Sequence, residues 1–332
     1  MKSHEYEFSL FEVLKLAGAI LAPLGMFALA MHLGATANLL PDPRPNLDID
    51  RTILLHQAEA SRSKHEADLV LIGDSSCLMD VSAPELAAAL PGHHRVLNLG
   101  TLSYLDLPAY ASMLRHYTAA NPNQLKILVL LMHPEALRRL APEEHHVEML
   151  NRHYSGADYC GPVSSPMICW IGGPIFKGRL LSRLIPVPLA GAYGWKYGFT
   201  ADLWEYLSAH DGSAVDPGKF DRATAKGNSE YSASLRLEAA SRTFRAAVPT
   251  GVRLMVGMTP APESFVPPTH GERYREMLSR WSQWLAADAA LAGLPPTLPD
   301  DLFASTTHLD EAGQRLFTGI LAQNLTAQLQ RQ

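Results

Sequence analysis

The feature that most constrains this chain is a run of four apolar residues, Leu69–Ile72, that leads directly into Gly73-Asp74-Ser75-Ser76. A short apolar run that ends at a turn is typical of a strand buried on both faces of a parallel sheet. Open α/β sheets bind their ligands just beyond the carboxyl ends of such strands. We therefore predict that Ser75 is a nucleophile presented at the edge of the sheet. An equally open alternative is that Asp74 and Ser75 only cap the helix that follows.

Further apolar runs repeat this pattern along the chain. They predict strands that end just before Gly100, His133 and Thr259, at 95–99, 126–132 and 252–258. Segments with apolar residues at helical spacing separate or follow them, at 83–90, 106–119, 274–291 and 311–329. Strands that alternate with helices predict an α/β fold, with a doubly wound parallel sheet and helices on both of its faces.

The alternation breaks down between about 141 and 250, where the chain is rich in glycine, proline, tyrosine and tryptophan. We interpret this segment as an irregular insertion that decorates the carboxyl edge of the sheet, within a domain that spans 67–330. Its aromatic side chains suit carbohydrate stacking or a partner surface, or they simply pack the insertion onto the domain.

The amino-terminal region contains a stretch of 20 residues, 16–35, without a charged side chain. As a helix it would span about 30 Å, the thickness of the hydrocarbon core of a bilayer. The alternatives are a buried helix of a soluble protein and a signal peptide cleaved near Ala35-Thr36-Ala37. Three glutamates in the leader argue against cleavage. We therefore predict a short tail over 1–15, a transmembrane anchor over 16–40, and a linker over 41–66 that contains a helix at 50–64.

The charges that flank this stretch, two lysines before it and two arginines after it, do not fix its orientation in a membrane. The cysteines give one further indication. Cys160 and Cys169 lie nine residues apart in a loop-like stretch. Either they form a disulfide, which needs an oxidising compartment, or they are two unpaired buried thiols. The third cysteine, Cys77, has no basic neighbour in the sequence that would activate it.

Composition argues against several classes of function. The formal net charge is −5, so the chain lacks the basic footprint of a nucleic-acid-binding protein, and we expect no such partner. The three cysteines also lack the paired spacing of a zinc site. We therefore expect neither a metal nor a cofactor.

A serine hydroxyl is a weak nucleophile, and it needs a histidine base that a third group orients. Among the 14 histidines we select His308, which stands in a loop just before the helix predicted at 311–329. A loop in that position can fold back over the carboxyl ends of the strands. The alternative is a histidine that caps the helix or lies on the surface.

Three short blocks together resemble the SGNH/GDSL hydrolase superfamily: Gly73-Asp74-Ser75-Ser76, Asn98-Leu99-Gly100, and the segment 303–313 around His308. The resemblance covers roughly 67–135 and 250–330. It implies a flavodoxin-like SGNH fold in which Ser75 is the nucleophile and His308 is the base. It also implies that the backbone N–H groups of Ser75 and Gly100 form an oxyanion hole. We include Asp74, beside the nucleophile, among the candidate catalytic residues.

Two positions depart from the pattern of that family. It usually has an aspartate three residues before the base, where this chain has Ser305. A neutral hydroxyl can orient an imidazole but supplies no full charge, so Asp301, Asp310 or an acid from the insertion is the third member, or the site is a weaker dyad. The family also contributes an asparagine side chain to the oxyanion hole, and here His133 is the candidate donor. We expect Asn98 to be structural.

An anchor in front of such a domain resembles a narrower group, the membrane-anchored SGNH-like proteins that O-acetylate alginate and cellulose or transfer D-alanine to teichoic acids. The resemblance implies a domain on the periplasmic side of the inner membrane, a polysaccharide or other surface polymer as acceptor, and a multi-pass membrane-bound O-acyltransferase as partner. We expect an acetyl or D-alanyl transferase, or an esterase, that forms an acyl-serine intermediate. The alternative is a non-catalytic scaffold that binds the polymer, which the missing aspartate and asparagine favour.

Overall fold

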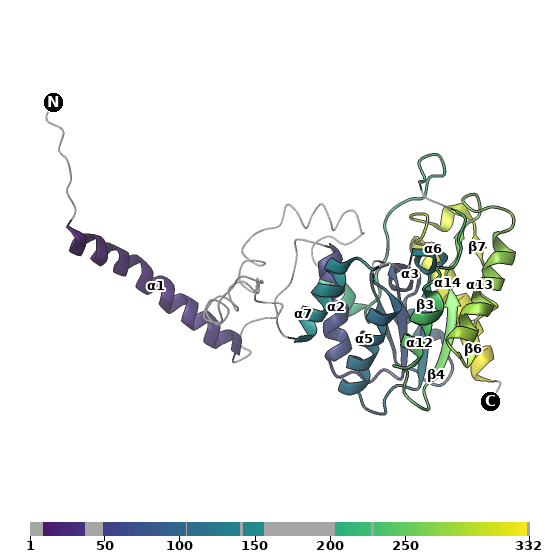
Figure 1. The fold of residues 1–332 in the computed structure, drawn as a ribbon, viewed down its shortest axis with the longest axis horizontal. Coiled ribbons are helices and arrows are strands. Elements are labelled where there is room, and N and C mark those ends of the chain that lie inside the picture. Colours follow the sequence, from purple (N-terminus) through teal and green to yellow (C-terminus); the bar gives the residue numbers. More distant parts are fainter. Residues whose placement is uncertain are drawn as a thin grey trace. The chain divides into compact units, whose positions relative to one another are not determined.

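The computed structural model describes residues 9–36, 49–103, 105–139, 142–155, 203–226 and 229–330 (Figure 1). The chain divides into two compact units, and each is described by itself. The first comprises Met1–Pro45 and Ser155–Pro186, and the second comprises Asn46–Tyr154 and Val187–Gln332.

The first unit contains α1 (Leu10–Thr36), which is built largely from apolar residues. Ser9 and Glu12 close its first turn: the Glu12 carboxylate accepts the N–H of Ser9 at 2.9 Å, and Ser9 Oγ accepts the N–H of Glu12 at 3.3 Å. This reciprocal cap explains why the helix begins before the uncharged stretch. The window Leu10–Phe27 has a mean hydropathy of 1.7 and no buried residue, so α1 is long and apolar enough to cross a membrane.

A parallel sheet of five strands forms the centre of the second unit, in the order β2-β1-β3-β4-β6. The predictions of an α/β fold and of a parallel sheet are therefore confirmed. β1, β2 and β3 are buried along their whole length, which is why they read as continuous apolar runs. The strands are β1 (Leu69–Gly73), β2 (Val96–Gly100), β3 (Ile127–Met132), β4 (Arg253–Met258) and β6 (Ala289–Ala290), with a separate parallel pair of β5 (Ala261–Pro262) and β7 (Thr297–Leu298).

The helices pack in groups. α2 and α12 both contact α5, and α11 contacts α2, whereas α14 contacts α3 and α4. α13 contacts α12 and β4. The helices are α2 (Ile49–Arg62), α3 (Ser75–Asp80), α4 (Ala83–Ala89), α5 (Leu107–Ala120), α6 (Pro134–Arg139), α7 (Glu144–Ser155), α11 (Leu203–Ala209), α12 (Leu237–Arg245), α13 (His270–Trp284), the short 3-10 helix η1 (Asp300–Leu302) and α14 (Glu311–Leu329).

Two segments contribute more to the fold than the sequence predicts. α2 lies within the predicted linker, but its Ile53 and Leu54 are buried and the helix packs against α5. α7, α11 and α12 lie in the segment predicted to be irregular. In α12 only Leu237, Ser241 and Phe244 are buried, about one residue per turn. The helix is nevertheless strongly amphipathic, so its pattern is present in the sequence, and the prediction of an irregular segment misses it.

The order of the sheet places a crevice beside β1. The chain passes from β1 to one neighbour, β2, and then crosses to the other neighbour, β3, and open α/β sheets bind ligands where the order reverses in this way. Gly73 ends β1 and lies opposite Gly100 and Leu131. A Cβ at Gly73 would overlap the carbonyl oxygen of Leu131, so only glycine allows β1 and β3 to approach so closely two residues before Ser75.

Candidate active site

Asp74 fixes the turn between β1 and α3. Its Oδ1 accepts the N–H groups of Ser76 and Cys77, at 3.1 and 3.4 Å, and the Ser76 hydroxyl at 2.6 Å. Its Oδ2 accepts the N–H of His133, just after β3, at 3.0 Å. Burial raises the pKa of Asp74, and these donors oppose the shift. Asp74 thus has the capping role that the sequence left open, and Ser75 lies partly buried at the start of α3.

His308 lies in a tight loop between η1 and α14. Its carbonyl accepts the N–H groups of Ala304 and Ser305, at 3.0 and 3.2 Å. A bridge between Phe303 and Leu309 closes the base of the loop. The candidate Ser305 uses its hydroxyl to accept the backbone N–H of His308 at 3.0 Å, so Ser305 shapes the turn but does not orient the imidazole through a hydrogen bond.

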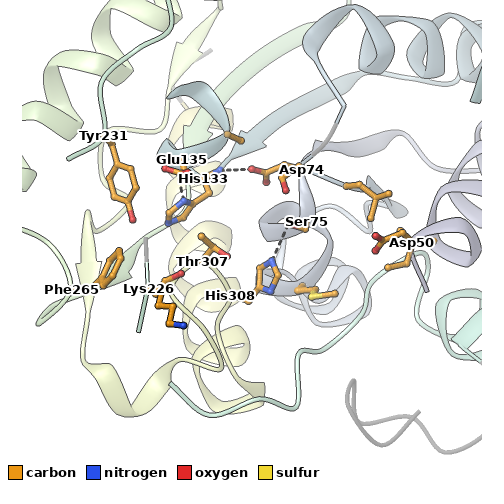
Figure 2. A pocket seen from close by; sticks show the side chains of 16 residues that line it. Asp50, Asp74, Ser75, His133, Glu135, Lys226, Tyr231, Phe265, Thr307 and His308 are labelled. Atoms are coloured by element: carbon orange, nitrogen blue, oxygen red, sulfur yellow. Dashed lines mark hydrogen bonds between the residues drawn. The ribbon is translucent and has the colours of Figure 1, made fainter. Parts of the chain in front are cut away.

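The structure brings Ser75 and His308 together although they are 233 positions apart. Ser75 Oγ lies 2.9 Å from Nε2 of His308, and Figure 2 shows the imidazole directed at the serine. Nδ1 of the same ring lies 2.8 Å from Oδ2 of Asp216. A carboxylate can only accept, so Nδ1 carries the proton and Nε2 accepts from the serine hydroxyl. These three side chains have the geometry of a nucleophile, a base and an acid that orients the base.

Asp216 is therefore the acid that the sequence left unassigned, and it comes from the predicted insertion. Its Oδ1 accepts the N–H of Gly218 at 2.9 Å, which fixes the carboxylate while Oδ2 faces His308. The other two acids considered do not contact the ring. Asp310 caps α14 by accepting the N–H of Gly313 at 2.8 Å. Asp301 is an exposed residue of η1. Asp216 carries no motif, and only its Asp-Pro-Gly turn distinguishes it in the sequence.

Gly100 does not have the free N–H that the resemblance implies for an oxyanion hole. This N–H donates to Asn98 Oδ1 at 2.8 Å, and the Gly100 carbonyl accepts from Gln57 Nε2 at 2.7 Å. A Cβ here would overlap the backbone nitrogen of Leu78, so the glycine instead allows β2 to contact α3. Asn98 is structural, as expected, because its Nδ2 donates to the carbonyl of Cys77 at 2.8 Å.

His133 lines the pocket as a neutral ring. Its Nδ1 accepts the N–H of Glu135 at 3.1 Å, so the proton is on Nε2, which is buried and has no hydrogen-bond partner in the described part of the chain. Burial lowers the pKa of His133 to about 3, with the charges of His308 and His270 acting in the same direction. Figure 2 shows the ring on the side of Tyr231, away from Ser75. Its role as an oxyanion donor stays a prediction.

Ser75 and His308 line a pocket of about 310 Å³. Figure 2 shows Asp50 on one side of this pair, and Tyr231 and Phe265 on the other. Buried apolar side chains from three separate elements form part of the wall, namely Ile53, Met79 and Leu102. No motif indicated that α2 contributes Asp50 and Ile53. The pocket thus places the candidate nucleophile and its candidate base between a mixed wall and an aromatic wall.

The cysteines add no second reactive centre within the described residues. Cys77 is fully buried, and burial raises the pKa of its thiol well above the ordinary value, so it is not a thiolate at neutral pH. The predicted pair Cys160 and Cys169 lies outside the described residues. Across the described ranges, no group of three or more histidine, cysteine, aspartate or glutamate side chains could hold a metal ion.

Comparison with known proteins identifies no relative, because no family model matches the chain and no curated protein matches it. What the site can do therefore has to be argued from its geometry. A serine hydroxyl that donates to an imidazole, whose other nitrogen donates to a carboxylate, can lose its proton to that imidazole and attack a carbonyl carbon.

Proposed function

We propose that this protein is a membrane-anchored, serine-dependent acyltransferase or esterase. The observation that supports this most is the pair of contacts Ser75 Oγ–His308 Nε2 and His308 Nδ1–Asp216 Oδ2, at 2.9 and 2.8 Å. A histidine that only caps a helix or lies on the surface would not need a serine on one ring nitrogen and a carboxylate on the other. A pocket lined by the serine and the imidazole supplies the room for a substrate.

The proposed reaction has two stages. Ser75 Oγ attacks the acyl carbonyl carbon while His308 Nε2 takes its proton, and Asp216 stabilises the imidazolium that forms. The oxyanion of the tetrahedral intermediate lies near the N–H of Ser75, a first-turn helix N–H that no intrahelical carbonyl accepts. The intermediate collapses as His308 protonates the leaving oxygen, which leaves an acyl-serine. An acceptor hydroxyl, from a sugar or from water, then reverses these steps and releases the acyl group.

The narrower parts of the proposal rest on the family resemblance. The strand order β2-β1-β3-β4-β6 is that of flavodoxin-like doubly wound sheets, which supports an SGNH-type fold. We propose an acetyl or D-alanyl group as cargo, a surface polysaccharide or other polymer as acceptor, and a multi-pass membrane-bound O-acyltransferase as partner. α1 supports an anchor in the inner membrane, with the α/β unit proposed to lie on the periplasmic side.

A fluorophosphonate probe tests the proposed nucleophile, because it forms a covalent bond only with an activated serine. We expect the full chain to be labelled, with the adduct mapped by mass spectrometry to Ser75. Ser75→Ala should abolish labelling without lowering the melting temperature, whereas Ser279→Ala, at an exposed position of α13, should label normally. A folded wild-type protein that never reacts at Ser75 would falsify the proposal.

A non-catalytic scaffold is the second candidate function. It is favoured by the N–H of Gly100, which donates to Asn98 Oδ1 at 2.8 Å and is therefore not free to hold an oxyanion. A scaffold would bind the polymer with equal affinity in the wild type and in Ser75→Ala, and neither would react with the probe.

A second experiment separates a transferase from an esterase. It compares the transfer of a labelled acetyl group from an activated ester to a polymer with the release of labelled acetate to water.

A further inference from the structure

The proposed triad is assembled from three segments that are distant in the sequence, so its two hydrogen bonds depend on how those segments are held. Ser75 is the first residue of α3. The segments that carry Asp216 and His308 both contact the opposite end of this helix, which we call the last turn of α3, residues 78–80. Its residues are 0–3% exposed, and none of them belongs to the three sequence blocks described above.

Asp80 holds the loop that carries the base. Its side chain is fully buried, and its Oδ1 accepts the N–H of Leu309, the residue after His308, at 2.8 Å. α3 has six residues, so about 7.5 Å of helix separates Ser75 from Asp80. One rigid helix thus carries the nucleophile at its start and the acceptor for the loop of the base at its end.

Gln314 holds the segment that carries the acid. It lies in α14, is 5% exposed, and its Nε2 donates to the carbonyls of Met79 and Ala214, both at 2.6 Å. The N–H of Ala214 in turn donates to the carbonyl of Leu78 at 3.0 Å. Because Ala214 precedes Asp216 by two residues, the carboxylate is fixed to the same turn as the loop of the base.

The charge state of Asp80 suits this role. Burial raises its pKa well above the ordinary value; the carboxylates of Asp74 and Asp216 act in the same direction, and the backbone N–H that it accepts and the Thr259 hydroxyl oppose them. Burial thus disfavours a negative charge on Asp80, and a neutral carboxyl can still accept the N–H of Leu309 through Oδ1.

We propose that Asp80 and Gln314 are positioning residues, which set the separations Ser75–His308 and His308–Asp216 through the last turn of α3. The inference rests on the proposed function for its catalytic meaning. The placement of His308 against Asp216, however, can be measured without any substrate.

The experiment uses the full chain in detergent, labelled with ¹⁵N-histidine, and two readouts. The first is the low-field proton resonance of His308 Nδ1–H, which reports its hydrogen bond to Asp216 and is assigned with His308→Gln. The second is the rate of fluorophosphonate labelling at Ser75. We expect Asp80→Ala to lose the resonance and to slow labelling about 100-fold, the effect of a displacement near 1 Å. Asp80→Asn should retain both, because its amide oxygen can still accept the N–H of Leu309.

Asn121→Ala is the matched control for lost stability. Asn121 is 6% exposed, donates to the carbonyls of Ser63 and Tyr117 at 2.9 and 3.1 Å, and precedes β3 at the amino ends of the strands, whereas Ser75 follows the carboxyl end of β1. It should lower the melting temperature but preserve the resonance and the labelling rate.

Two outcomes overturn the proposal: a wild-type resonance and labelling rate in Asp80→Ala, or an Asp80→Asn variant as impaired as Asp80→Ala. If Asp80→Ala does not fold, Gln314→Met decides, because it retains the side-chain length but cannot donate, and an unchanged resonance there overturns the proposal. A wild type that shows the resonance but never reacts with the probe contradicts the proposed function instead. In that case the resonance alone still decides the positioning role.

Discussion

At the scale of single residues, Asp216 shows how one carboxylate can serve structure and chemistry at once. Oδ1 is held by the N–H of Gly218, and Oδ2 receives Nδ1–H of His308. The first contact fixes the plane of the carboxylate, and the second selects the tautomer that leaves Nε2 free to accept from Ser75. Both side chains of this hydrogen bond are largely buried, at 17% and 14% exposure, so water competes for it only in part.

Replacing Asp216 by asparagine tests this selection of the tautomer. The amide nitrogen would favour a proton on Nε2 of His308, which then cannot accept from Ser75. We expect the rate of probe labelling to fall about a thousand- to ten-thousand-fold with little change in the melting temperature. Asp221→Asn, at an exposed position in the same segment, should react like the wild type. Equal rates in the two variants would exclude Asp216 from the mechanism.

The stability of the Asp80→Asn variant should depend on pH in a specific direction. Unfolded Asp80 loses its proton above about pH 4, whereas burial raises the pKa of Asp80 in the folded protein, so the folded carboxyl holds its proton to a higher pH. The folded state then binds more protons, so this residue lowers the free energy of unfolding as the pH rises. We expect Asp80→Asn to match the wild type near pH 4 and to melt at a higher temperature at pH 8. A difference in melting temperature that does not vary with pH would contradict this account.

At the scale of elements, the contact between β2 and α3 helps to position Ser75, the first residue of α3. Gly100 is the residue of closest approach, and a Cβ there would overlap the backbone of Leu78. β2 also supplies Asn98, whose Nδ2 donates to the carbonyls of Cys77 and Val81, at 2.8 and 3.3 Å. β2 thus holds α3 through close packing at Gly100 and through the side chain of Asn98.

Two glycine substitutions test this packing with the same chemical change. Gly100→Ala should lower the free energy of unfolding by about 1–3 kcal/mol, because the added methyl group meets backbone atoms. Gly319 lies within α14, where nothing stands within 4 Å of an added Cβ. Gly319→Ala should therefore raise the free energy of unfolding by about 0.5–1 kcal/mol. Urea denaturation of both variants measures the difference. Equal effects would show that the contact between β2 and α3 is not close-packed.

The sequence predicts elements whose burial follows a regular pattern, and it misses residues whose position depends on how distant segments pack. Strands buried on both faces must be continuous apolar runs, so β1, β2, β3 and β4 could be located, and with them Ser75. His308 could be chosen because it precedes a recognisable helix. Asp216 could not, because its position depends on how a long segment folds back onto α3. The expectation of a free Gly100 N–H fails for a similar reason. A motif indicates where a backbone N–H lies, but it does not show that the side chain of Asn98 already accepts its hydrogen bond.

At the scale of the whole molecule, two buried histidines should make the fold sensitive to acid. Burial lowers the pKa of His56 to about 4 and that of His133 to about 3, below the value of about 6.5 in the unfolded chain. Between these values the unfolded state binds more protons, so the free energy of unfolding falls as the pH falls. Each histidine should contribute a loss of about 2 kcal/mol between pH 7 and pH 5.

Urea denaturation at a series of pH values measures this loss. His56→Gln should weaken the dependence of the free energy of unfolding on pH, since glutamine does not titrate. His145→Gln, at an exposed position of α7, should preserve this dependence. A difference in free energy of unfolding between wild type and His56→Gln that stays constant between pH 7 and pH 5 would contradict the buried neutral state of His56.

The separation of 233 positions between Ser75 and His308 has a consequence for biosynthesis. While the polypeptide emerges from the ribosome, its early portion already contains the serine turn, but no imidazole is there to abstract the proton. In the proposed mechanism, Ser75 becomes reactive only once α14 has docked and brought the loop of His308 with it. An incomplete chain that lacks this loop would then not react.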